Sequence, residues 1–411
     1  MNGRFVPDPP GGIATLLATL LSAVCSGVQV NAQTTDQLYA AAKAEQSVVV
    51  WAAGPARGYE SAAQAFEQRF PGITVSLTGG FSNVLNTGLE EQFRAQKIET
   101  DVAILQSIQD FIGWKTRGLL LNYKPDGFNQ VSSRSRDPDG AWISIITNPI
   151  FYGYNTEHVR KQDVPMSAID FLKARFNGKL VTAYPADDDA TLFAFTNIVR
   201  KYGWGYMDQY MKQQPKFIQG HLGVARSLGS GESFVSFDNT AGSTLFVQGE
   251  GGKVALAAPT DDFLPVFFTA EAIFKDAPHP NAAKLLVSFL LSKEWQAQAQ
   301  GYSSRYDVPA PAGLLSLSSY RLDNRYVEFL TGAEQLADLR RRFERYSGPV
   351  TNTGGVIDAN GVLRNTTSTQ GKMGTGRNVA AANPEGGPNF REKMQREKIE
   401  MLASERISEL I

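Results

Sequence analysis

The sequence predicts an α/β protein of two lobes joined by two crossover strands. Segments with β-type patterning alternate with helical segments of about 10–15 residues, which is typical of sheets covered by helices on both faces. Two β-rich runs, 143–155 and 265–274, are much longer than the ~5–6 residues of an ordinary strand. They flank a block that is long enough to build a second lobe.

The first lobe begins with an amphipathic helix at 36–45 and a buried-type strand at 47–51. A Gly/Pro loop at 52–58 leads into a helix at 59–70, which Pro71-Gly72 ends. The alternation then continues with a strand at 73–77, a helix at 83–96 and a strand at 102–105. This order predicts parallel strands connected by helices.

We interpret the two long runs as crossover strands, by which the chain leaves lobe 1 near Thr147 and returns near Phe268. The first run is interrupted by Pro149, and the alternative is two long edge strands in a single sheet. Between the runs, the pattern predicts a helix at 168–176, a strand at 179–183, a helix at 191–202 and strands at 234–237 and 254–256. After them it predicts helices at 281–291, 294–300 and 332–346.

These elements predict the domain organisation. Lobe 1 comprises 36–147 together with 268–346, and lobe 2 comprises 148–267. The remaining segment, 347–411, is rich in Gly, Asn and Thr up to residue 389, so it predicts a mobile tail, with an amphipathic helix at 391–411.

The N-terminus predicts an export signal at 1–32. Residues 13–24 form an apolar run that is shorter than the ~20 residues of a membrane span, and small residues at Val30 and Ala32 suit cleavage after Ala32. An uncleaved anchor or a wrongly assigned start are the alternatives. A lipid anchor at Cys25 is disfavoured, because the residue three places earlier is not leucine. We therefore expect a periplasmic or secreted protein whose mature chain has no cysteine.

Composition excludes several classes of function. The chain has 411 residues, with 40 Lys+Arg against 41 Asp+Glu, so it lacks the positive charge that nucleic-acid binding uses. One cysteine and three histidines exclude Cys-rich zinc sites, iron–sulfur clusters and cysteine catalysis. We expect a monomer without a cofactor, and we expect His158, His221 and His279 to be solvated loop residues.

Candidate binding residues of lobe 1 follow its strands. In open α/β sheets, ligands bind beyond the carboxyl ends of strands, where helix N-termini present free N–H groups. We expect ligand contacts there from Gly54, Arg57, Ser82, Asn83 and Ser107. The alternatives are an ordinary turn with a solvated Arg57, and helix capping by Ser82 or Asn83.

In lobe 2, Asp187-Asp188-Asp189 opens a helix, and capping is the leading interpretation of these carboxylates. A ligand contact or a metal site are the alternatives, although no calcium-loop spacing is present. We nominate Asp188 and Thr191 as ligand-binding residues. Ser236, Asp238 and Asn239 end a strand beside the return crossover and complete the nominated set.

The order of these elements resembles the extracytoplasmic solute-binding proteins of ABC importers, in the branch that includes the ferric-iron-binding receptors. The resemblance is spread over many short segments from Asp36 to Ser347, such as SVVVWAA, ETDVAILQS, ISIITNPIFYGYNTEHV and DAPHPNAAKLLVSFLLSKEWQAQAQ. It implies a type II periplasmic-binding-protein-like fold, a small-molecule solute held between the lobes and a membrane permease as partner.

The ferric-binding members carry neighbouring tyrosines late in lobe 2. Here residues 232–239 read ESFVSFDN, with phenylalanines and no tyrosine. We therefore expect a small organic or phosphorylated solute and no metal, with ferric iron as the alternative. The rivals from other classes are an enzyme on the same scaffold using Asp188 and Arg57, and an interaction module that acts through the C-terminal helix. The motifs G-x-S-x-G, P-loop and H-E-x-x-H are missing from the sequence, which argues against the enzyme.

Overall fold

The computed structural model describes residues 34–298, 301–350, 356–357 and 363–364. These residues lie in one compact unit, Met1–Thr366, and the second unit, Thr367–Ile411, lies outside them. The predicted export signal at 1–32, Cys25 and the predicted helix at 391–411 also lie outside the described residues. No helix in the described ranges is long and apolar enough to cross a bilayer.

Lobe 1 is built on a mixed sheet with the strand order β11-β4-β10-β3-β1-β2, in which β12 also pairs with β10. Its strands are β1 (Ser47–Ala53), β2 (Thr74–Gly80), β3 (Val102–Leu105), β4 (Ile143–Pro149), β10 (Leu264–Ile273), β11 (Tyr302–Ser303) and β12 (Leu322–Asp323). β1 is parallel to β2 and β3, as predicted, but β10 is antiparallel to both β3 and β4. The expectation of purely parallel strands is wrong for β10, because this strand returns from lobe 2 instead of following a helix of lobe 1.

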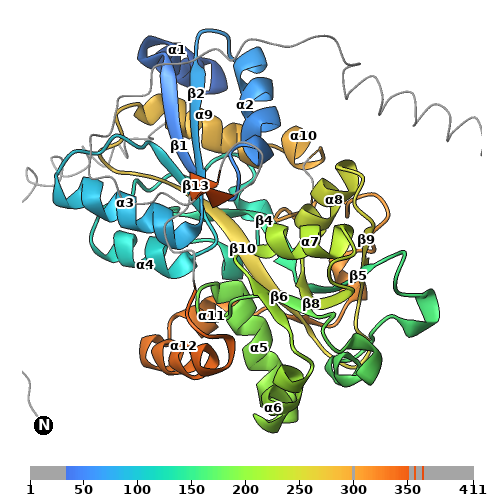
Figure 1. Cartoon of the computed structure of the whole chain (residues 1–411). Coiled ribbons are helices and arrows are strands. Elements are labelled where there is room, and N and C mark those ends of the chain that lie inside the picture. Colours follow the sequence, from blue (N-terminus) through green and yellow to red (C-terminus); the bar gives the residue numbers. More distant parts are fainter. Residues whose placement is uncertain (1–33, 299–300, 351–355, 358–362, 365–411) are drawn as a thin grey trace, which may run out of the picture. The chain divides into compact units, whose positions relative to one another are not determined.

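Helices cover both faces of this sheet (Figure 1). They are α1 (Thr35–Glu45), α2 (Arg57–Arg69), α3 (Ser82–Arg94), α4 (Ile108–Thr116), α9 (Pro280–Leu291) and α10 (Lys293–Gln296). α9 packs against α1, α2 and β1, where the Phe66 and Phe289 rings meet edge to face at 5.6 Å. On the other face, Phe93 and Trp114 join α3 to α4.

Lobe 2 is built on the strand order β8-β5-β9 and on the parallel pair β6-β7. A parallel bridge between Leu180 and Val235 links the two. The strands are β5 (Phe151–Asn155), β6 (Val181–Ala183), β7 (Lys216–Ile218), β8 (Val235–Asn239) and β9 (Val254–Ala257). Their helices are α5 (Asp189–Tyr202), α6 (Gly205–Lys212), α7 (His221–Gly229) and α8 (Ala241–Gly249).

Four short elements, β7, α6, α7 and α8, were not predicted. Each is too short to show a clear periodicity of apolar residues. The helix predicted at 168–176 is wrong. This segment forms two 3₁₀ helices, η4 (Ala168–Leu172) and η5 (Ala174–Phe176), separated by Lys173 in extended conformation. Shorter elements are η1 (Phe128–Gln130), η2 (Ser133–Ser135), η3 (Lys161–Asp163), η6 (Leu317–Ser319) and the hairpin β13 (Val356–Ile357)–β14 (Leu363–Arg364).

The two long runs cross between the sheets in different ways. The first breaks at Ile150, with β4 in the lobe 1 sheet and β5 in the lobe 2 sheet. The second, β10, is continuous over ten buried residues. Ile150 N donates to Pro265 O at 2.8 Å, so the two crossings are joined where they leave the lobe 1 sheet. The exact lobe limits at 147/148 and 267/268 stay a prediction.

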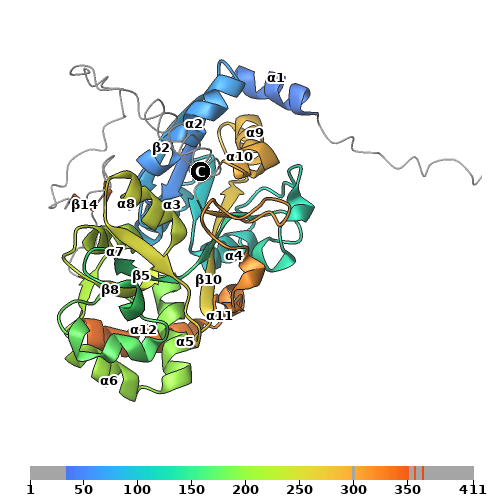
Figure 2. The same cartoon turned by 90° about the vertical axis from the view of Figure 1, so that its right-hand side faces the viewer.

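A third segment links the lobes. α11 (Tyr326–Leu330) contacts both α4 and α5, and α12 (Ala333–Ser347) packs on α5 (Figure 2). The Tyr326 hydroxyl donates to Gln106 O at 3.2 Å, next to the carboxyl end of β3. Phe343 of α12 packs on Phe195 of α5. The helix predicted at 332–346 is therefore present, and it packs on a helix of lobe 2.

Candidate functional site

A cavity of about 270 Å³ lies between the strand ends of lobe 1 and the helices α7 and α8 of lobe 2. We call it the cleft. Its lobe 1 wall comes from the loops after β1 and β2 and from Gln106 after β3. Its lobe 2 wall contains Asp188, the start of α7 and the start of α8, and Phe267 and Thr269 of β10 close it. The cleft thus lies at the carboxyl ends of the lobe 1 strands, and ligand binding there stays a prediction.

In the lobe 1 wall, the backbones of the loops after β1 and β2 approach each other closely. Gly54 adopts a positive φ of 96° and its N–H donates to Gly80 O at 2.8 Å. A Cβ atom on Gly79 would lie 2.3 Å from Ala56 N, so only glycine permits this approach of the two loops. Gly54 lines the cleft as nominated. Arg57 does not line it, but its guanidinium lies 5.9 Å from the ring centre of Phe246, which does.

The polar nominees of lobe 1 are divided between the cleft and a neighbouring cavity. Ser82 lines both, and its Oγ accepts from Gln106 N at 3.3 Å. Asn83 and Ser107 line only the neighbouring cavity. Ser82 and Asn83 are not the N-cap of α3, which is Phe81 without a side-chain cap bond. The capping interpretation is therefore wrong for α3, because the helix begins one residue earlier than predicted.

Asp188 confirms the capping interpretation and also faces the cleft. Its Oδ1 accepts from the N–H groups of Ala190 and Thr191 at 2.9 Å, which caps α5. Its Oδ2 accepts from Gln106 Nε2 at 2.9 Å, so one carboxylate joins the two lobes. Gln106 was part of a candidate loop but was not nominated, and its amide is the partner that only the fold brings to Asp188.

His221 is the main functional residue that the sequence analysis missed. The expectation of a solvated loop residue is wrong, because His221 begins α7, is only 9% exposed and lines the cleft. Its ring stacks on Phe267 at 5.4 Å, and its nitrogens face Asp238 Oδ1 at 3.1 Å and Asp188 Oδ1 at 3.5 Å. The only local signal in the sequence for a helix start at His221 was the preceding Gly220, and a single glycine is a weak signal.

Charge pairing fixes the protonation of this group. Burial alone would lower the pKa of His221, but the carboxylates of Asp188 and Asp238 outweigh burial and raise it well above 6.5. Burial would likewise raise the pKa of Asp188, but His221 outweighs it and lowers this pKa to about 2. The cleft wall therefore carries an imidazolium beside an ionised carboxylate.

The other two histidines, His158 and His279, differ from each other in exposure. His158 is exposed in a turn, which confirms the expectation. His279 is only partly exposed, and its Nδ1 lies 2.8 Å from Asp101 Oδ2, so the expectation of a solvated residue is wrong there. It lies in front of α9, outside the cleft.

The remaining nominees form a network behind the cleft wall, and none of them lines the cleft. They are fully buried. Asp238 Oδ2 accepts from Thr191 Oγ1 at 2.9 Å and from Ala183 N at 3.0 Å. Ser236 Oγ accepts from Asp238 N, and Asn239 Oδ1 accepts from Thr240 N, both at 3.0 Å. This network fixes the Asp238 carboxylate that faces His221.

The neighbouring cavity, of about 430 Å³, is acidic and is crossed by interlobe bonds. Asn83 Nδ2 donates to Asp187 Oδ1 at 2.8 Å, and Gln109 Nε2 donates to Asp189 Oδ2 at 2.5 Å. Arg340 of α12 forms an ion pair with Asp189. Burial raises the pKa of Asp187 above its usual value. These bonds hold the lobes together beside the cleft.

Three helices begin at the cleft. α2, α3 and α7 all begin at it, and none has a side-chain cap bond. The first N–H groups of an uncapped helix lack intrahelical acceptors and carry the positive end of the helix dipole. Some of these N–H groups already have acceptors, because Gly58 N and Tyr59 N of α2 donate to Pro55 O and Ala56 O. The positive dipole ends of three helices and the His221 imidazolium face one cavity, and His221 also faces the carboxylates of Asp188 and Asp238.

Metal ligation has little support within the described ranges. They contain no group of three or more His, Cys, Asp or Glu side chains placed to hold a metal ion. Phe237, in the segment where the ferric-binding branch carries tyrosines, is buried against Phe195 and Tyr210. The one tyrosine of the cleft, Tyr59, donates its hydroxyl to Ala53 O at 2.9 Å, and burial raises its pKa.

The fold and the cleft define the class of this protein, which is a two-lobed α/β protein with a cavity between its lobes. The chain belongs to the bacterial extracellular solute-binding protein family, whose sequence pattern matches residues 101–325. This is a family of solute-binding proteins rather than of enzymes. No curated protein matches the chain by sequence.

Solved structures of periplasmic binding proteins have the same fold. AfuA from Actinobacillus pleuropneumoniae, with exogenous fructose-6-phosphate bound, has a TM-score of 0.64 and 18% identity over 74% of this chain and 99% of that chain. Iron-bound HitA from Pseudomonas aeruginosa has a TM-score of 0.59 and 19% identity over 72% and 99%. The ferric binding protein from Campylobacter jejuni has a TM-score of 0.56 and 17% identity over 72% and 99%. The predicted two-lobed fold and its resemblance to the iron-binding branch are confirmed.

Proposed function

We propose that this protein is an exported receptor that captures a small anionic solute, phosphorylated or carboxylated, and delivers it to the permease of an ABC importer. The observation that carries the proposal is the convergence of three uncapped helix N-termini and the His221 imidazolium on one cleft. Helix N-termini bind phosphate and carboxylate groups through backbone N–H groups. The helix N-termini and the His221 imidazolium attract the anion.

The rest of the cleft suits the body of a polar solute. Thr240, Ser243, Asn148 and Thr269 offer hydroxyl and amide groups for hydrogen bonding. Phe81 and Phe246 offer rings against which a sugar or carbon skeleton packs. Each lobe supplies part of this lining, so a bound solute contributes most in the closed state and shifts the open–closed equilibrium towards it.

The competing functions have weaker support. Ferric iron requires anionic oxygen ligands, whereas Tyr59 is held protonated and donates to a backbone carbonyl. A hydrolytic enzyme requires a nucleophile in contact with a base. The nitrogens of His221 face the carboxylates of Asp238 and Asp188 instead of a hydroxyl or thiol, so His221 is not the base of such a pair.

Thermal shift and calorimetry on the full chain test the proposal. Sugar phosphates, phosphonates and small carboxylates are compared with neutral sugars and with ferric citrate. We expect one anionic class to raise Tm and to be recovered unchanged by mass spectrometry. A shift with ferric citrate alone would establish the iron receptor instead, and turnover of the bound compound would establish an enzyme.

Two histidine variants provide a matched comparison. His221→Gln removes the cation of the cleft, and we expect it to weaken binding by roughly tenfold or more, the range for a charge-assisted bond. His158→Gln changes an exposed histidine outside the cleft and should bind like the wild type. Ser243→Ala, at the start of α8, is a smaller change that tests the same cleft if His221→Gln unfolds. Equal affinities in all variants would contradict the proposal.

A further inference from the structure

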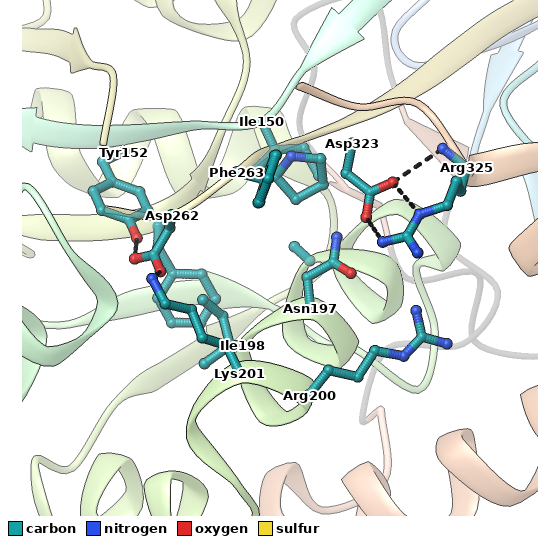
Figure 3. A pocket seen from close by; sticks show the side chains of 13 residues that line it. Ile150, Tyr152, Asn197, Ile198, Arg200, Lys201, Asp262, Phe263, Asp323 and Arg325 are labelled. Atoms are coloured by element: carbon teal, nitrogen blue, oxygen red, sulfur yellow. Dashed lines mark hydrogen bonds and ion pairs between the residues drawn. The ribbon is translucent and has the colours of Figure 1, made fainter. Parts of the chain in front are cut away.

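A second pocket, of about 260 Å³, lies where α5 meets the crossovers and shares no residue with the cleft (Figure 3). Its walls come from the second half of α5, the Ile150 link between β4 and β5, the start of β10, and β12. The cleft uses the opposite end of α5, at Asp188. Asn197 to Lys201 follow that residue by about 9–13 positions, or ~14–20 Å of helix.

We call this second pocket the hinge pocket, and its floor is apolar. Ile150, Ile198, Pro265 and Phe263 line it. Ile150 is 1% exposed, whereas the Phe263 ring is 51% exposed at the rim. A large exposed aromatic residue beside a concave apolar surface is costly in water, and a bound apolar group would cover it.

Two carboxylates of the pocket are already neutralised, and they lie at opposite ends of it (Figure 3). Asp262 accepts from the Tyr152 hydroxyl at 2.7 Å and from Lys201 Nζ at 2.6 Å. Asp323 accepts from Arg325 Nε at 2.8 Å and Nη2 at 2.7 Å, which is a bidentate pair. Neither carboxylate has an unmatched negative charge to offer a cationic ligand.

The donors of the pocket are not all used. Arg200 forms no ion pair or hydrogen bond with any residue in the described ranges, and in Figure 3 its side chain extends towards the Asp323–Arg325 end. Asn197 lies between the two charged ends, and its amide interacts with the Asp323 carboxylate and helps to lower the pKa of Asp323, although its Nδ2 forms no bond of regular hydrogen-bond geometry among the described residues. The pocket therefore combines an apolar floor with one cation at its exposed rim, Arg200, which has no ion-pair partner among the described residues.

From this arrangement we propose that the hinge pocket is a second binding site, which takes a small carboxylate with a compact apolar body. The carboxylate pairs with the Arg200 guanidinium, and the apolar body packs on Ile150, Pro265 and Phe263. The volume is just below the ~300–1,000 Å³ of ordinary ligand pockets, so the ligand is of fragment size.

The position of the pocket gives such a ligand an effect on the cleft. Ile150 and Pro265 belong to the two crossings and are joined by a backbone hydrogen bond at 2.8 Å. Domain closure changes the backbone at a few such residues. A ligand that packs on both residues binds the open and closed states with different affinities. It therefore changes the affinity of the cleft for its solute, and the solute changes the affinity of the hinge pocket for this ligand by the same factor.

The test uses the full chain and two isosteric probes, benzoate and benzamide, in calorimetry or ligand-observed NMR. We expect benzoate to bind with a Kd on the order of 1 mM or tighter, and benzamide to bind roughly tenfold more weakly. Arg200→Gln should remove this preference for benzoate and leave benzamide unchanged. Arg341→Gln, at an exposed arginine of α12 outside the pocket, is the matched control and should behave like the wild type.

Phe263→Ala should weaken both probes, because it removes the apolar wall without a change in charge. Unaltered Tm of the unliganded variants shows that they fold. No saturable benzoate binding, or benzoate binding that Arg200→Gln leaves intact, would overturn the proposal. Binding that His221→Gln abolishes and Arg200→Gln does not would place benzoate in the cleft, which also overturns it. Loss of benzoate binding in the hinge pocket would leave solute capture in the cleft untouched, because capture has its own test.

Discussion

Gln106 and Asp188 join the two lobes directly, because Gln106 Nε2 donates to Asp188 Oδ2 at 2.9 Å. Gln106 follows β3 in lobe 1, and Asp188 caps α5 in lobe 2. The same carboxylate faces His221 on the cleft wall. Asp188 thus caps the N-terminus of α5, pairs with the His221 imidazolium and connects the two lobes. Interlobe closure and the charge of the site are therefore linked.

Gln106→Ala removes this interlobe bond. A hydrogen bond to a charged group contributes about 1.5–3 kcal/mol, so we expect solute affinity to fall by roughly tenfold or more, mainly through faster dissociation. The open state should also gain population, which small-angle X-ray scattering detects as a larger radius of gyration without solute. Gln298→Ala, which removes only a local bond to Glu294 O, is the control. An unchanged dissociation rate would contradict a role of Gln106 in closure.

The His221–Asp188 pair predicts a specific dependence of stability on pH. The folded state holds the His221 proton more tightly than the unfolded state, so this contribution is complete below about pH 6.5 and is lost as pH rises through the folded pKa. The Asp188 contribution is complete above about pH 3.8 and is lost as pH falls towards 2. The destabilisation caused by His221→Gln should therefore be largest between about pH 4 and 6.5 and should shrink at alkaline pH.

Chemical denaturation of the variant and the wild type across this pH range provides the measurement. His158→Gln serves as the control for loss of an imidazole outside the cleft. A difference in the free energy of unfolding that does not vary with pH would show that His221 is not held as an imidazolium.

Glu271 is a buried carboxyl group of β10, at 1% exposure, and neither oxygen has a hydrogen-bond partner among the described residues. Burial raises its pKa well above 4.5, so the folded state keeps the proton while the unfolded state loses it as pH rises. Stability is therefore lost with rising pH, by about 1.4 kcal/mol for each unit between the two pKa values.

Glu271→Gln cannot ionise, so its free energy of unfolding should rise relative to the wild type as pH increases from about 4.5 to 8. Denaturant titrations at both ends of this range measure the change. Glu91→Gln, at an exposed carboxylate, should show no comparable trend. A parallel pH profile for Glu271→Gln and the wild type would contradict a protonated Glu271.

Gly79→Ala tests the close approach of the two loops that form the lobe 1 wall. The new Cβ would lie 2.3 Å from Ala56 N and 2.5 Å from Gly54 O, and backbone atoms cannot move aside cheaply. We expect a loss of at least about 1–3 kcal/mol of stability, measured by Tm, together with weaker solute binding. Gly113→Ala, in α4 with nothing within 4 Å, should be neutral or stabilising by up to about 1 kcal/mol. Similar effects of both substitutions would argue against the tight contact.

The sequence identified the elements whose pattern is local. The alternation from β1 to β3, the continuous run of β10 and the helix α9 were predicted close to their limits, because each has a clear period and a turn at its end. Gly54, Ser82 and Asp188 were likewise placed in the cleft by the rule that ligands bind at strand ends. Short elements such as α7 and α8 were missed, because eight or nine residues do not distinguish a helix from a loop by pattern.

Hydropathy and spacing along the chain thus determined the fold class, the two crossings and the edge of the sheet that lines the cleft. Only the tertiary structure decided that β10 is antiparallel to β3, that Thr191 and Asp238 lie behind the cleft wall, and that His221 is a buried cation. The physical reason is distance along the chain. Asp188 and Asp238 set the charge of His221, and they lie 33 and 17 residues away from it, so no local pattern reports their electrostatic effect.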